Sequence, residues 1–100
     1  MSDTAVKSRE LVTTNLKPPN KYKVIVINDD QTPVEFVIVM LITVFRHTQD
    51  SATALTIKVH NEGSAVAGLY TYEIAEQKMI DAINMARENS YPLQIKVEEE

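Results

Sequence analysis

The chain has 100 residues, of which 44% are hydrophobic, so it can bury one core and has no room for a second. Its formal net charge is −4, with acid gathered at the last three positions and basic residues scattered, which excludes a basic stripe that would follow a nucleic-acid backbone. The lack of cysteine excludes disulfides, thiolate catalysis and cysteine-bound zinc.

Residues 1–20 are predicted to form a flexible N-terminal extension that ends in the stiff Pro18-Pro19 pair. They contain no apolar core of the kind that a signal peptide needs. The longest apolar run, residues 34–45, is shorter than the roughly 20 residues that span a bilayer. We therefore expect a cytoplasmic chain with one domain at residues 21–100, and neither membrane nor nucleic acid among its partners.

Residues 22–27 are rich in β-branched side chains and predict a largely buried strand. A helix N-terminus is predicted directly afterwards, with Thr32 as N-cap, Pro33 at the first helical position and Glu35 closing a capping box. Capping leaves Asn28, Asp29 and Asp30 unexplained. These three residues fit either a turn whose side chains bond to its own backbone or a binding site.

Two helices are predicted next. Residues 33–46 are apolar on almost every side, so this helix must be covered by sheet, by helix or by a ligand. Residues 49–62 form the second helix, which ends at Gly63 as a left-handed C-cap. Thr56 and His60 lie four residues apart on one face, bordered by Val59. The structural alternatives are a Thr56 hydroxyl bonded to the carbonyl of Ala52 and a His60 that interacts with the helix dipole.

The remaining residues predict a strand at 64–72, a helix at 73–89 and a half-exposed strand at 93–97. Gly68, in the middle of the first of these, indicates a bulge or a close backbone approach. The resulting order, β-α-α-β-α-β, predicts an α+β domain in which a three-stranded antiparallel sheet packs against three helices.

No catalytic constellation is present. The candidates for chemistry are Asp29, Asp30, His60, Glu73 and Glu76. Two adjacent aspartates diverge on an extended chain, so they make a poor metal site. The chain has no GxSxG pattern for a nucleophile, and two glycines cannot build a phosphate-binding loop. We expect no enzyme activity, no cofactor and no metal.

Three segments together resemble ClpS, the bacterial N-end rule adaptor of the Clp unfoldase-protease. They are LKPPNKYKVIVINDDQTPVEFV, ATALTIKVHNEGSAVAGLYTYEIAEQK and ARENSYPLQIKVE, and they cover about residues 16–97. The resemblance implies an adaptor that binds a protein's first residue when that residue is bulky and hydrophobic, and delivers the protein to the N-domain of a Clp AAA+ unfoldase. The competing class is a small α/β protein-interaction module that does not read N-termini.

The resemblance also implies a role for individual residues. Asn28 and His60 would accept directly from the substrate's α-amino group and Asp29 through water, while Asp30 and Thr32 border this site. The substrate's first side chain would enter a pocket lined by Val34, Val37, Thr56, Val59 and Leu93. Glu73 and Lys78 would contact the ATPase N-domain, and residues 1–20 would be engaged by the ATPase during delivery.

The chain departs from the family pattern at Thr56 and Val34, where methionine is common. Gln31 also replaces a tyrosine in the junction, and Gln77 replaces a threonine beside Lys78. Because threonine is shorter than methionine, the pocket should admit β-branched side chains. We predict that Leu, Ile and Val at the first position are bound within the same order of magnitude.

Overall fold

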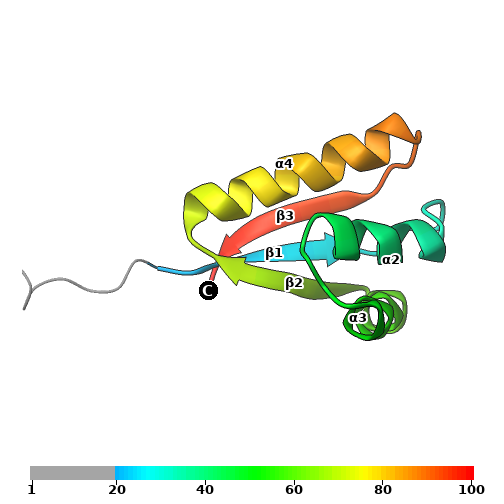
Figure 1. Ribbon diagram of the computed structural model, residues 1–100, viewed down its shortest axis with the longest axis horizontal. Coiled ribbons are helices and arrows are strands. Elements are labelled where there is room, and N and C mark those ends of the chain that lie inside the picture. Colours follow the sequence, from blue (N-terminus) through cyan, green and yellow to red (C-terminus); the bar gives the residue numbers. More distant parts are fainter. Residues whose placement is uncertain (1–19) are drawn as a thin grey trace, which may run out of the picture.

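The computed structural model describes residues 20–100 as six elements in the predicted order (Figure 1). They are β1 (Tyr22–Ile27), α2 (Val34–Thr43), α3 (Gln49–Glu62), β2 (Ser64–Tyr70), α4 (Tyr72–Glu88) and β3 (Gln94–Glu99). The predictions for residues 1–19, a flexible extension engaged by an ATPase, lie outside the described residues. No helix within residues 20–100 is long and apolar enough to cross a membrane.

The three strands form one antiparallel sheet in the order β2-β1-β3, so the β-branched run lies in the centre. Val26 pairs with Ala65 of β2 and with Ile95 of β3, which brings three buried side chains to one face. Alternate residues of a strand share a face, so Val24 lies on the same face as Val26, and this face carries the core. The predicted α+β fold is confirmed.

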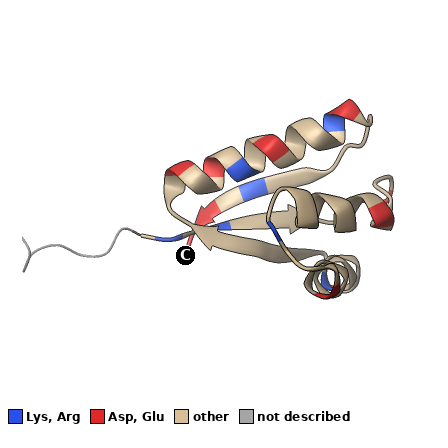
Figure 2. Cartoon of the chain, viewed as in Figure 1, with Lys and Arg blue, Asp and Glu red and all other residues tan. Residues whose placement is uncertain are grey.

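Helix α4 lies along the sheet (Figure 1) and presents Ala75, Ala82 and Ala86 to the core, all completely buried. Their small side chains let the helix approach the strands closely. Helix α2 adds Met40 and Leu41 to the same core. Charged residues are interspersed along α4, whereas α2 is uncharged apart from Glu35 near its start (Figure 2).

The edge strand β2 contains the predicted irregularity. Val24 pairs with Gly68 and Ile25 with Val66, so Ala67 is left without a partner and the register shifts. A Cβ at position 68 would lie 2.7 Å from the Tyr70 ring, which explains why this position holds glycine. The predicted bulge at Gly68 is confirmed, whereas the group that approaches this glycine closely is the Tyr70 side chain rather than another backbone segment.

His47 holds the bulge in place, a role that the sequence did not reveal. Its Nε2–H donates to the carbonyl of Ala67 at 2.7 Å, and its Nδ1 and the Ser51 hydroxyl are hydrogen-bonded at 2.8 Å. The connection between α2 and α3 is thereby tied to β2. Arg46, in the left-handed region with φ 63°, turns the chain out of α2, and the His47 N–H bonds to the Leu41 carbonyl. Helix α2 therefore ends at Thr43, earlier than the predicted 46.

Candidate functional site

A cavity of about 290 Å³ lies where β1 passes into α2, beside the last turns of α3. Figure 1 shows α3 and the start of α2 together near this end of β1. The cavity is lined by polar residues on the β1–α2 junction and by apolar residues on the two helices. The lining residues are Asn28, Asp29, Asp30, Thr32, Pro33, Val34, Val37, Thr56, Val59 and His60.

The backbone positions the polar end of the cavity. The Asn28 N–H donates to the carbonyl of Gly63 at 2.9 Å, so the end of β1 is fixed to the end of α3. Gly63 can terminate α3 there because its φ of 92° suits glycine, and its N–H closes the helix on the Val59 carbonyl. His60 lies one turn earlier and lines the same cavity as Asn28.

The side chains of Asn28 and His60 are exposed. Among the described residues, neither the Asn28 amide nor the His60 ring has a hydrogen-bond partner. An amide oxygen and an unprotonated imidazole nitrogen are acceptors, so two acceptors are available at this end of the cavity.

Asp29 is bonded within the junction. Its Oδ1 accepts from the N–H of Gln31 at 2.7 Å and of Thr32 at 2.8 Å, and its Oδ2 accepts from the Thr32 hydroxyl at 2.7 Å. Burial raises the pKa of the Asp29 carboxyl, but these hydrogen bonds outweigh that effect and hold the pKa below its ordinary value of 3.8. The Asp29 side chain therefore bonds to its own turn, as one of the two interpretations predicted. One lone pair of the carboxylate remains free to accept a further hydrogen bond.

The predicted capping box is wrong. Pro33, in an extended conformation, is the N-cap of α2, and no side chain caps this helix. The physical reason is that α2 begins one residue later than predicted, so Thr32 lies outside the N-cap position, and its hydroxyl donates to Asp29 instead. The first turn of α2 is closed instead by the Pro33 carbonyl, which accepts from the N–H groups of Phe36 and Val37. Thr32 stiffens the border of the cavity rather than the helix.

Asp29→Ala is expected to lower the unfolding free energy at pH 7 by about 1 kcal/mol, because three hydrogen bonds to a partly exposed carboxylate are lost. The folded-state pKa is depressed, so this contribution is full above the unfolded-state value and is lost as the pH falls through the folded-state value. Urea unfolding should show that the difference in unfolding free energy between the parent and Asp29→Ala narrows below pH 3.8. Asp30→Ala, at an exposed neighbour, is the control. A difference independent of pH would contradict the account.

Buried apolar groups form the inner wall of the cavity. Val37, Thr56 and Val59 are each at most 6% exposed, whereas Val34 is 49% exposed at the mouth. The Thr56 hydroxyl donates to the carbonyl of Ala52 at 2.8 Å, as the structural alternative predicted. Because this bond uses the only hydrogen of the hydroxyl, Thr56 offers the cavity no hydrogen-bond donor.

Leu93 does not line the cavity, contrary to the prediction. It is only 1% exposed and packs in the hydrophobic core just before β3. Leu93 was predicted as the first residue of the last strand, but β3 begins at Gln94 and the Leu93 side chain is enclosed by other core residues. Pro33 lines the cavity instead, although the sequence offered only its helix-starting role.

Glu73 and Lys78 lie away from the cavity, on α4. Glu73 is exposed in the first turn of that helix. The Lys78 ammonium, in contrast, donates to the carbonyl of Val44 at 2.8 Å and lies 5.9 Å from the centre of the Tyr70 ring. Lys78 therefore holds the end of α2 against α4. Sequence reasoning missed this structural role.

The whole arrangement suits recognition of a small group that is positively charged at one end and apolar at the other. The polar end offers acceptors beside an ionised carboxylate, and the inner wall offers buried methyl groups. No three His, Asp or Glu side chains within the part of the chain that the structure describes converge to hold a metal ion.

The family model for the ATP-dependent Clp protease adaptor protein ClpS matches residues 17–96. The chain belongs to the ClpS family. It is thus related to the adaptors of ATP-dependent Clp proteases rather than to the proteases themselves.

Its relatives match most of the length of the chain. It is 44% identical to the ClpS of Helicobacter hepaticus over 99% of this chain and 98% of the relative, and 48% identical to the ClpS of Sodalis glossinidius over 86% and 81%. Among solved structures, Agrobacterium tumefaciens ClpS2 bound to L-phenylalaninamide superposes with a TM-score of 0.81. The two are 40% identical, and the match covers 83% of this chain and all of that one.

Proposed function

We propose that this protein binds the free α-amino group and the hydrophobic side chain of another protein's first residue, without catalysing a reaction. It would deliver such proteins, which carry N-degrons, to a Clp AAA+ unfoldase in the cytoplasm. The observation that supports this most is one cavity that combines an apolar inner wall with acceptors, on Asn28 and His60, that bond to no other residue among 20–100. The related ClpS2 was solved with L-phenylalaninamide, which carries both a free amino group and an apolar side chain.

The amino-group end follows from the chemistry of an ammonium ion. An ammonium has three donors and loses hydration when it is partly buried, so it needs acceptors in a fixed array. Asn28 and His60 supply two of them. Asp29 supplies the opposite charge, and its remaining lone pair can accept through a water molecule. Asp30 and Thr32 form the border, where Thr32 keeps Asp29 in position.

The side-chain end is the wall formed by Val34, Val37, Thr56 and Val59. Burying a Leu or Ile side chain against it contributes roughly 1.5 to 3 kcal/mol. A micromolar affinity corresponds to about 8 kcal/mol, so the amino-group contacts and the peptide backbone must supply most of the binding free energy. We therefore propose that a free amino group is obligatory and that Leu, Ile and Val are bound alike.

Delivery requires a second surface, away from the cavity. We propose that the exposed Glu73 on α4 contacts the N-domain of the unfoldase. Lys78 remains a candidate for the same contact, in which case its ammonium would have to share or give up the Val44 carbonyl. Residues 1–20 are proposed as the segment that the unfoldase engages.

A set of peptides that differ only in the first residue tests the proposed function. Fluorescence anisotropy should show comparable affinities for Leu, Ile and Val, and affinities at least about 10-fold weaker for Gly, Asp and Lys, which bury no apolar side chain. Aromatic first residues belong in the set as a measure of pocket size. Equal affinity for all first residues would mean that the cavity does not read the N-terminus.

A further inference from the structure

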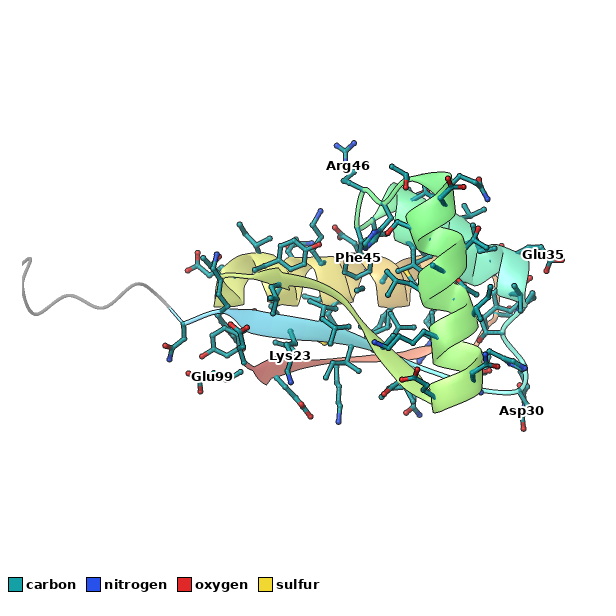
Figure 3. All side chains as sticks on the ribbon, turned by 90° about the horizontal axis from the view of Figure 1, so that it is seen from below. Lys23, Asp30, Glu35, Phe45, Arg46 and Glu99 are labelled. Carbon is teal, nitrogen blue, oxygen red and sulfur yellow. The ribbon has the colours of Figure 1, made fainter. Side chains whose placement is uncertain are left out.

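A second hollow adjoins the first on the other side of α2. This groove has a volume of about 510 Å³ and is lined by Pro33, Glu35, Phe36, Val39, Met85, Asn89 and Tyr91. Pro33 lines both hollows, so the first cavity and the groove meet at the start of α2. Figure 3 shows Asp30 and Glu35 at this same end of the molecule.

The helical repeat explains why two hollows flank one helix. Val34 and Val37, three residues apart, face the first cavity, while Phe36 and Val39, also three apart, face the groove. An extended chain advances about 3.3 Å per residue, so a chain that leaves the first cavity across Pro33 places its third or fourth residue about 7 to 10 Å beyond its first.

Four of the seven residues that line the groove are apolar, namely Pro33, Phe36, Val39 and Met85. The rings of Phe36 and Tyr91 meet edge to face with centroids 4.9 Å apart, and Met85 adds a side chain that adapts to different shapes. The Asn89 amide donates to the carbonyl of Met85 at 3.0 Å, so it is occupied within the helix end. Glu35 is the one charged side chain in the lining.

We propose that this groove binds an apolar side chain at the third or fourth position of the same chain whose first residue occupies the cavity. The proposal rests on the proposed function, because the first residue must be anchored for the chain to leave across Pro33. The occupant is a continuation of the bound chain because the two hollows share Pro33 as a wall, so a chain anchored in the first cavity passes directly into the groove. Substrate choice then depends on two positions of the N-terminus.

The test uses a Leu-initiated peptide with alanine at positions 2 to 5, and four variants with phenylalanine at one of these positions. Affinity should rise about 5- to 10-fold for phenylalanine at position 3 or 4 and stay near the alanine value at position 2. Val39→Lys, at a 49% exposed wall of the groove, should abolish this gain without changing affinity for the alanine peptide. Ile57→Lys, at a 54% exposed position on α3 outside both hollows, is the matched control and should keep the gain.

The outcomes separate the two proposals. The groove proposal is overturned if phenylalanine raises the affinity at no position, or if the rise in affinity survives Val39→Lys. In either case, binding of the alanine peptide would leave the proposed N-degron function intact. Failure of the parent protein to bind the alanine peptide overturns both. A gain that disappears equally in Ile57→Lys also overturns the groove, because the loss would then follow from the added charge alone.

Discussion

Asn28→Ala is expected to weaken binding of a Leu-initiated peptide by about 10- to 100-fold, the effect of losing one hydrogen bond to a charged group. The thermal midpoint should stay close to that of the parent protein. The side chain is exposed and is not bonded to any other described residue, so no core contact is lost. The structural bond at this position uses the backbone N–H, which donates to Gly63 and is retained in alanine.

The measurement pairs a binding titration with thermal unfolding. Asn61→Ala is the matched control, because Asn61 is exposed on α3 next to His60 but does not line the cavity. Its affinity and midpoint should both equal those of the parent. A parallel loss of midpoint and affinity in Asn28→Ala would return Asn28 to a purely structural role.

Thr56→Met is expected to make the protein reject Ile and Val while it still binds Leu. Methionine is two heavy atoms longer, and Thr56 lies 4% exposed against Val37 and Val59, so the extra atoms must enter the cavity. They would meet the branch methyl at the substrate's Cβ, and overpacking of this kind costs about 1 to 3 kcal/mol. The Ile-to-Leu affinity ratio should therefore fall by roughly 10-fold or more.

The Thr56→Val variant is the matched control for size. Valine keeps the shape but loses the bond to the Ala52 carbonyl, so binding of Ile and Val should persist even if stability declines. The measurement is the affinity of Leu-, Ile- and Val-initiated peptides for the parent protein, Thr56→Met and Thr56→Val. An Ile-to-Leu ratio that is low and equal in the parent protein and in Thr56→Met would show that position 56 is not a gatekeeper.

Local chemistry explains which parts of the fold were predictable. The β-branched run of β1, the helical spacing of α3 and the stop at Gly63 each depend on a few neighbouring residues, and each was placed correctly. The Thr32 capping box failed because Pro33 takes the N-cap position in an extended conformation, and the sequence does not show this shift of one residue. The early end of α2 likewise depends on the left-handed Arg46.

The same distinction applies to the candidate site. Asn28, Asp29 and Asp30 were singled out because a turn needs fewer polar residues, and the structure gathers them with His60 around one cavity. Leu93 was misplaced because sequence shows that a side chain is apolar but not whether it faces a cavity or the core. The bond from Lys78 to Val44 spans 34 residues, a separation at which no local pattern operates.

The most direct test compares two Leu-initiated peptides that differ only in N-terminal acetylation. Acetylation removes the charge and leaves one N–H in place of three donors, while the Leu side chain is unchanged. Isothermal titration should give clear binding to the free peptide and an affinity at least about 100-fold weaker for the acetylated one, since contacts to a charged group are lost at Asn28, His60 and Asp29 together. Equal affinity for the two peptides would contradict recognition of the free N-terminus by this cavity.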